Sequence, residues 1–154
     1  QVAGRAGRGE KPGQVVIQSY QPEHYALASA IKQDYRLFFA QEFDRRKKAL
    51  YPPFTLMVRF LCDAKTMEDA RKAAEEIKTE IETRFANTLL WRRMLYIRSD
   101  EAPIGKIQDR CRAQVLMKLL NHPDTDQLLE AFQEMVKTER NVHTVLEINP
   151  SSLA

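Results

Sequence analysis

Cysteine and histidine are scarce in this sequence, and their positions argue against a metal site or a disulfide. The chain has 154 residues, of which two are cysteine and three are histidine. Cys62 and Cys111 stand far apart, and neither has a histidine or a second cysteine at the spacing of metal ligands. We therefore expect both to be buried apolar thiols. The histidines are too scattered for a catalytic or metal site, so we expect no metal in this chain.

Long hydrophobic runs are also absent. The longest apolar segments, such as Thr55-Leu56-Met57-Val58, are far too short to cross a bilayer. No basic segment followed by an apolar one marks a signal peptide. With 44% hydrophobic and 29% charged residues, the composition is that of a globular domain, alone or with an appendage. We expect a cytoplasmic protein with no membrane partner.

Positive charge is concentrated in one part of the chain. The formal net charge is +3, yet residues 84–118 contain eight Lys and Arg against three Asp and Glu, so the remainder is net negative. A second basic cluster is Arg45-Arg46-Lys47-Lys48. Such clusters favour a polyanion or an acidic peptide as partner. For any single cluster, solvated surface charge is an equally good interpretation.

Before residue 55 the sequence predicts a short strand and a long helical segment. Residues 13–19 are rich in Val and Ile and follow a Pro-Gly pair, which is typical of a strand. Residues 23–50 carry apolar side chains near helical spacing without proline or glycine, which predicts one long helix or two helices. The Tyr51-Pro-Pro-Phe54 segment cannot continue a helix, so we place a domain boundary near it.

From Thr55 onward the pattern predicts two βαβ units in succession. The expected elements are a strand at 55–62, a helix at 67–85, strands at 94–98 and 111–120, a helix beginning near Asp124 and a strand at 142–148. This βαββαβ order predicts an α+β, ferredoxin-like fold, in which two helices cover one face of a four-stranded antiparallel sheet. The first and third strands are then adjacent, which brings Cys62 near Cys111.

The third expected strand gives the sheet two chemically different faces. Its alternate residues from Cys111 to Leu119 are expected to face the helices. The residues expected on the other, open face are Arg110, Arg112, Gln114 and Lys118. The open face is therefore the expected place for a binding site.

The first nine residues are rich in Gly and Arg and allow three interpretations. They lack the spacing of a phosphate loop, and their composition alone fits a disordered basic tail. The third interpretation depends on residue order, because Gln1, Gly4, Arg5, Gly7 and Arg8 resemble the sixth conserved motif of superfamily II helicases. That resemblance implies that Arg5 and Arg8 contact the γ-phosphate of ATP, where charge develops in the transition state, with Gln1 and Gly4 supporting them.

A resemblance to one helicase family extends over essentially the whole chain. It rests on the motif at the start, on the Tyr51-Pro-Pro-Phe54 corner, and on Ala102-Pro103-Ile104 followed by Lys106, Arg110, Arg112, Gln114 and Lys118. These features resemble the C-terminal end of the primosomal protein N′ family of replication-restart DNA helicases. Two departures are visible. Cys111 stands where the family usually has an aromatic residue, and Ser-Asp-Glu precedes Ala102 in place of a stretch containing Gly-Pro.

The resemblance implies the C-terminal part of an ATP-driven 3′ to 5′ helicase that recognises stalled forks and helps to reload the replicative helicase. Residues 1–21 would be a remnant of the second RecA-like lobe, residues 22–52 a helical connector, and residues 53–154 the ferredoxin-like domain. The parent would use ATP with magnesium and bind zinc through a Cys-rich segment. This chain has no Gly-Lys-Ser/Thr loop, acidic magnesium motif or Cys-rich segment, so we expect it to hold none of these cofactors and to hydrolyse no ATP alone.

The resemblance also implies partners. The family's C-terminal domain contributes to binding branched DNA and helps to hold the acidic tail of single-stranded DNA-binding protein. By position, Arg110 and Gln114 match the tail-binding residues, since Arg can grip a carboxylate and Gln can donate to a peptide carbonyl. The candidates for contacts with branched or single-stranded DNA are Arg92, Arg93, Lys106, Arg112 and Lys118. Other primosome proteins are further expected partners.

Two interpretations from other classes stay open. An RNA-recognition-type module shares the βαββαβ order, but it stacks bases on aromatic residues of its central strands, and the third strand here has none. A purely structural interaction domain would make no contact with nucleic acid, and its polar residues would simply solvate the open face. Salt-dependent binding to fork DNA separates these possibilities.

Overall fold

The computed structural model describes residues 14–123, 125–136 and 141–151. The chain divides into two compact units, Gln1–Arg45 and Arg46–Ala154. The division falls inside a helix, α2, so the end of this helix belongs to the second unit.

The helical part of the first unit consists of two helices, α1 (Tyr25–Ile31) and α2 (Tyr35–Lys48). The chain leaves α1 through Gln33, whose φ of 53° is left-handed and cannot continue a right-handed helix. The side chain of Asp34 then accepts a hydrogen bond from the Leu37 N–H at 2.9 Å and caps the start of α2. Of the two predicted alternatives, one helix or two, the second is therefore correct.

The strand predicted at residues 13–19 does not form. Residues 14–19 have neither helical nor strand structure, and Gly13 lies outside the described residues. A β-strand satisfies its backbone N–H and C=O groups by pairing with a neighbouring strand. None of the strands of the described sheet pairs with this segment, so its Val and Ile content alone does not make it a strand.

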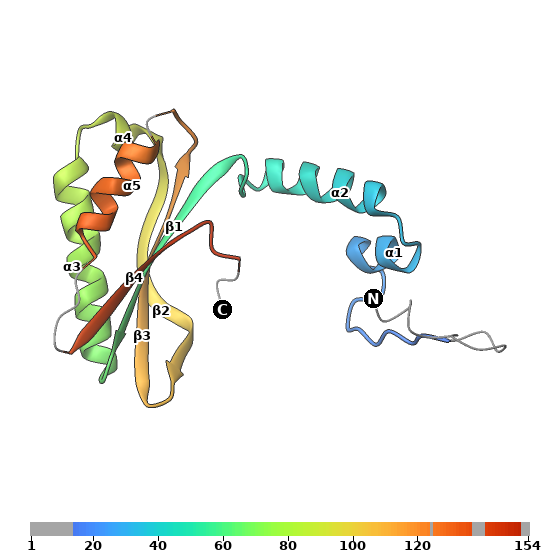
Figure 1. Cartoon of the computed structure of the whole chain (residues 1–154), viewed down its shortest axis with the longest axis horizontal. Coiled ribbons are helices and arrows are strands. Elements are labelled where there is room, and N and C mark those ends of the chain that lie inside the picture. The colour runs from blue at the N-terminus through green and yellow to red at the C-terminus, as the bar shows by residue number, and fades with distance from the viewer. Residues whose placement is uncertain (1–13, 124, 137–140, 152–154) are drawn as a thin grey trace. The chain divides into compact units, whose positions relative to one another are not determined.

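The second unit has the predicted ferredoxin-like fold (Figure 1). Its elements are β1 (Thr55–Ala64), α3 (Met67–Phe85), the short α4 (Leu89–Arg93), β2 (Met94–Ile107), β3 (Arg110–Leu120), α5 (Thr125–Glu134) and β4 (Val142–Ile148). The strand order is β2-β3-β1-β4, and all three neighbouring pairs are antiparallel. Helices α3 and α5 lie on the same side of the sheet (Figure 1).

The core fills the space between this sheet and its helices. Alternate residues of β1, from Leu56 to Ala64, and of β3, from Ala113 to Leu119, are buried there. Phe132 of α5 is fully buried, and its ring meets those of Phe60 and Phe85 edge-on, with centroids 5.8 and 5.7 Å apart. Aromatic rings prefer this geometry because a positive ring edge then meets a negative face.

The register between β1 and β3 confirms the predicted proximity of the two cysteines. Cys62 lies opposite Ala113, and Cys111 lies opposite Ala64, so the two cysteines are diagonal neighbours on adjacent strands. Both are free. Cys62 is buried as expected, and desolvation raises the pKa of its thiol to about 11, which keeps it protonated at neutral pH. Cys111 is only partly buried.

Strand β2 is much longer than the predicted 94–98. It continues to Ile107 and joins β3 through a tight turn at Gln108-Asp109, whose φ values of 48° and 63° are those of a type I′ hairpin turn. Between the pairs Glu101–Ala113 and Lys106–Cys111 the register shifts, which leaves Ala102-Pro103-Ile104-Gly105 as a bulge. Pro103 has no N–H and cannot donate to the hydrogen-bond ladder of the sheet. A segment that contains proline is therefore accommodated at a bulge.

Candidate functional site

The predicted site residues of β3 lie on the sheet surface that faces away from the helices, which we call the outer face. On β3 this face carries Arg110, Arg112, Gln114, Leu116 and Lys118, and on β1 it carries Thr55, Met57, Arg59, Leu61 and Asp63. The predicted alternation is therefore confirmed. The face is less open than expected, however, because Gln114 is 3% exposed and Lys118 is 8% exposed.

Lys118 is covered by the segment that leads into β1. Its ammonium lies 4.2 Å from the centroid of the Tyr51 ring and 5.5 Å from that of Tyr96, and it donates to the Ala49 carbonyl at 3.4 Å. Burial lowers the pKa of Lys118 because it removes water from the charged form. Lys118 therefore helps to join this segment to the sheet through cation–π contacts.

Arg110 lies at the opposite end of β3. Its Nε donates to the Asp63 carboxylate, and its Nη2 donates to the Asp63 backbone carbonyl at 2.8 Å. The Arg110 side chain remains 40% exposed. Asp63 thus fixes the direction of the guanidinium, while Nη1 is not used in these two bonds. This end can accept a further carboxylate or phosphate.

Arg112 is partly buried and lies opposite the β2 bulge. Among the described residues its side chain has no hydrogen-bond or ion-pair partner, in contrast to Arg110. Lys106, on the strand beside it, is exposed and lies 3.4 Å from the Asp109 carboxylate. Arg110, Arg112 and Lys106 all lie at the turn end of the β2–β3 hairpin, and we call these three the hairpin cations. Arg110 and Arg112 lie on the outer face, whereas Lys106, directly opposite Cys111, lies on the helix side.

Arg92 and Arg93 are not part of this group. They form the last turn of α4, whose start is capped by Thr88. Met94, the next residue, pairs with Leu119 at the far end of β3. At about 3.3 Å per residue, the length of β3 separates them from Arg110 by about 30 Å. The five predicted DNA-binding residues thus occupy two separate ends of the hairpin, with Lys118 buried near the second.

A buried ion pair crosses the middle of the outer face, and the sequence analysis did not find it. Arg59 of β1 is 4% exposed, and its Nε and Nη2 contact the Glu147 carboxylate of β4 at 2.6 and 2.5 Å. The sequence did indicate that Arg59 lies on the outer face, because its neighbours Val58 and Phe60 are apolar and alternate residues of a strand face opposite sides. Its partner depended on the β1–β4 register, which places Glu147 directly opposite.

Two buried polar atoms of the outer face lack hydrogen-bond partners among the described residues. They are Nη1 of Arg59 and Oε1 of Gln114. Gln114 lies opposite Leu61, two positions along β1 from Arg59, so the two side chains are diagonal neighbours. One is a donor and the other an acceptor. The predicted donor role of Gln114 stays a prediction, and its buried Oε1 is an acceptor without a partner among the described residues.

The remaining predicted site lies outside the described residues. Gln1, Gly4, Arg5 and Arg8, which form the expected helicase motif, belong to the segment before residue 14. In the part of the chain that is described, no group of three His, Cys, Asp or Glu side chains could hold a metal ion. No helix there is long and apolar enough to cross a membrane.

Fold and surface together define the class of this protein segment: an α+β, ferredoxin-like domain with cations gathered at one end of a sheet hairpin. No family model matches the chain. It is similar, however, to replication restart protein PriA from several bacteria. The chain is 31% identical to the proteins of Chlamydia pneumoniae and Bacillus subtilis, over 97% of its length in both cases. It is 30% identical to that of Synechocystis over 99% of its length.

These matches confirm the resemblance predicted from the sequence: nearly all of the chain is similar to a segment of replication restart protein PriA. The chain spans only about a fifth of the length of these relatives, 18% to 19% of the three named.

The buried Arg59–Glu147 pair predicts a specific pattern of stability. Glu147→Gln leaves the Arg59 guanidinium buried without a counter-charge, and we expect a loss of about 2 kcal/mol in the free energy of unfolding, below the cost for a fully buried pair because Glu147 is partly exposed. The double variant Arg59→Met with Glu147→Gln should lose less than Glu147→Gln alone, because no charge then remains buried. Urea denaturation of the 154-residue chain measures both.

The matched control is Arg71→Met, which breaks the exposed pair between Arg71 and Glu101. An exposed pair contributes about 0.2–1 kcal/mol. If Glu147→Gln costs no more than this control, the Arg59–Glu147 pair does not have the structural role assigned to it.

Proposed function

We propose that this chain is the C-terminal part of an ATP-dependent 3′ to 5′ DNA helicase that acts in the cytoplasm to restart replication and assemble the primosome. The observation that supports this proposal is the similarity to PriA over nearly the whole chain. Since the chain spans about a fifth of those relatives, helicase activity would belong to the complete protein, with magnesium and zinc held in its other parts.

In that complete protein, Arg5 and Arg8 would contact the γ-phosphate of ATP, and Gln1 and Gly4 would support their backbone. The guanidinium group suits this role because its planar set of donors matches the charge that spreads over the phosphoryl oxygens. The chain would supply only one side of the ATP site and would not hydrolyse ATP alone.

For the ferredoxin-like domain, we propose that the hairpin cations bind the acidic C-terminal tail of single-stranded DNA-binding protein. Three features support this partner. Asp63 fixes the guanidinium of Arg110, which is 40% exposed and whose Nη1 takes no part in the bonds to Asp63. Arg112 makes no ion pair among the described residues, because Asp63, directly opposite it on β1, is held by Arg110. Gln114 lies four residues along the same face, and its unpartnered Oε1 can accept a peptide N–H once the side chains that bury it move aside.

Fork DNA is the second proposed partner, and a different observation favours it. Arg92 is exposed at the end of α4, about 30 Å from the hairpin cations. A rigid tail peptide site does not need cations so far apart, whereas a DNA backbone presents phosphates along such a length. Arg92, with Arg93 beside it, would then contact one part of the DNA, and Lys106 and Arg112 another.

Replacing Arg110 by Ala in the complete protein should weaken binding of the acidic tail peptide by about tenfold or more, since a hydrogen bond to a charged group contributes about 1.5–3 kcal/mol. Fluorescence anisotropy with a labelled tail peptide measures the effect. Arg84→Ala removes the same charge from α3, where Arg84 pairs with Glu134, and should leave binding unchanged. Equal affinities for Arg110→Ala and wild type would refute the tail site.

Replacing Arg8 by Ala in the complete protein should abolish DNA-stimulated ATP hydrolysis and leave DNA binding intact, because the arginine would act on the phosphoryl group alone. The two readouts are phosphate release with and without fork DNA, and binding of the same DNA in a filter or anisotropy assay. Normal hydrolysis by this variant would exclude the proposed role of the motif.

A further inference from the structure

Trp91 is the single tryptophan of the chain, and it lies on the surface in α4. The residue through which α4 joins the core is its neighbour Leu90, whereas Trp91 is 38% exposed and does not belong to the core. Among the described residues its ring contacts no other aromatic ring and no cation, and its side-chain N–H has no hydrogen-bond partner. The indole is therefore available to a partner outside the chain.

The backbone that carries Trp91 is held at both ends of α4. The hydroxyl of Thr88 accepts a hydrogen bond from the Trp91 backbone N–H at 3.4 Å and donates to the Phe85 carbonyl at 2.6 Å. At the other end, the N–H of Met94 donates to the Trp91 carbonyl, and Met94 begins β2. The ring thus extends from a fixed position, which lowers the entropy cost of binding.

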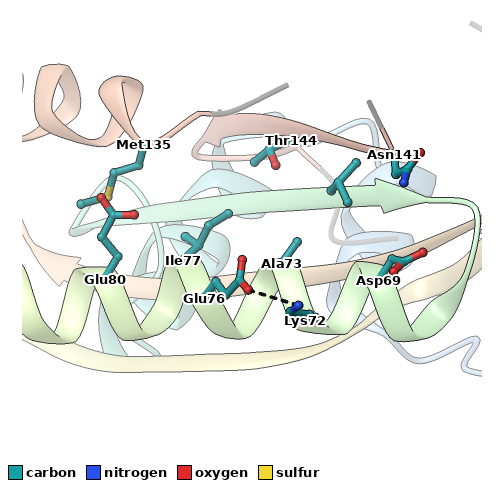
Figure 2. Close-up of a pocket in the computed structure, with 10 residues that line it drawn as sticks. Asp69, Lys72, Ala73, Glu76, Ile77, Glu80, Met135, Asn141 and Thr144 are labelled. Atoms are coloured by element: carbon teal, nitrogen blue, oxygen red, sulfur yellow. Dashed lines mark ion pairs between the residues drawn. The ribbon is translucent and has the colours of Figure 1, made fainter. Parts of the chain in front are cut away.

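Two arginines follow the tryptophan, and neither has an acidic partner in the described part of the chain. Arg92 and Arg93 make no ion pair there, and the Nε of Arg93 is buried without a hydrogen-bond partner. Residues 83–99 contain no Asp or Glu. Lys72 of α3 differs, because its ammonium lies 4.0 Å from the Glu76 carboxylate in the groove beside β4 (Figure 2). The charge of the two arginines is therefore available to an external anion.

We propose that Trp91 stacks on an unpaired base of single-stranded DNA, while Arg92 and Arg93 contact the phosphates beside that base. Stacking on an aromatic ring tolerates any base, because every base has a π face. The bases of a duplex are stacked on one another, so the ring selects a single strand. This inference rests on the proposed binding of fork DNA, and it assigns the single-stranded part of the fork to α4.

A second copy of this chain is the alternative occupant. Leu89 and Leu95 are also exposed close to Trp91 in the sequence, and apolar side chains of this kind can join two copies. A symmetric contact would, however, bring Arg92 and Arg93 of both copies together, and like charges repel. A nucleotide chain instead places a phosphate next to each base, so the charge of the arginines favours DNA.

The intrinsic fluorescence of the 154-residue chain tests the proposal directly, because Trp91 is its single tryptophan. The probe is an oligothymidylate of about 12 nucleotides, within the usual site size of single-strand binders. Binding of a labelled copy is measured separately by anisotropy at about 0.1 M salt, where exposed charges still interact. We expect saturable quenching of the Trp91 emission with the same midpoint as the anisotropy change. A duplex of the same length should bind without comparable quenching.

Four variants separate stacking from charge. Trp91→Ala should weaken single-strand binding about fivefold or more, the lower end of what one stacked base contributes, and leave duplex binding unchanged. Trp91→Phe keeps a ring and should retain most of the affinity. Arg92→Ala should also weaken binding, whereas Lys72→Ala removes the same charge from the groove of Figure 2 and should stay within about twofold of wild type. Circular dichroism shows that each variant is folded.

The outcomes distinguish this inference from the proposal on which it rests. Single-strand binding without quenching, or wild-type affinity of Trp91→Ala, overturns the stacking and leaves the binding of fork DNA intact. Absence of binding to both single strand and fork at low salt overturns both. A shift of the Trp91 emission to shorter wavelength when the chain alone is concentrated also overturns the stacking, because the ring would then be buried between two copies.

Discussion

Strand β1 is paired on both edges and buried on both faces, and the rest of the second unit is attached to it. On the helix side, residues such as Phe60 form the core. On the outer face, three of its polar side chains each hold a different part of the chain. Thr55 donates to the Leu50 carbonyl before the sheet, Arg59 pairs with Glu147 of β4, and Asp63 holds Arg110 of β3. Strand β1 thus holds the segment that leads into the sheet, the edge strand β4 and Arg110, which is the main candidate binding residue.

The turn end of the β2–β3 hairpin presents cations on both sides of the sheet. Arg110 and Arg112 lie on the outer face, and Lys106, which is paired with Cys111, lies on the helix side. The bulge of β2 shapes this end, since it leaves Arg112 without a paired residue on that strand.

The sequence predicted much of this fold because alternation and helical spacing are strong in β1, α3, β3 and β4, and the strand order then fixed which faces and which cysteines meet. The sequence analysis was wrong or silent where a feature depends on contacts between residues that are far apart in the chain. Residues 14–19 have strand composition, but no strand in the described part of the chain pairs with them. The full length of β2 was not predicted, because Pro103 and several polar residues interrupt the alternation of apolar and polar residues. The turn that follows β2 also contains no glycine to mark a hairpin. The burial of Lys118 depends on Tyr51, which is 67 residues earlier in the chain, and no local sequence pattern predicts that contact.

The central claim is that Arg110, held in place by Asp63, receives the acidic partner. A direct measurement is a nuclear magnetic resonance titration of the 154-residue chain with the acidic tail peptide of single-stranded DNA-binding protein, in which the arginine Nε–H signals are followed. The account predicts that the Arg110 Nε–H signal and the backbone amides of residues 110–114 shift in a saturable way, while those of α3 do not. Shifts confined to other parts of the chain, with the Arg110 signal unmoved at saturating peptide, would contradict it.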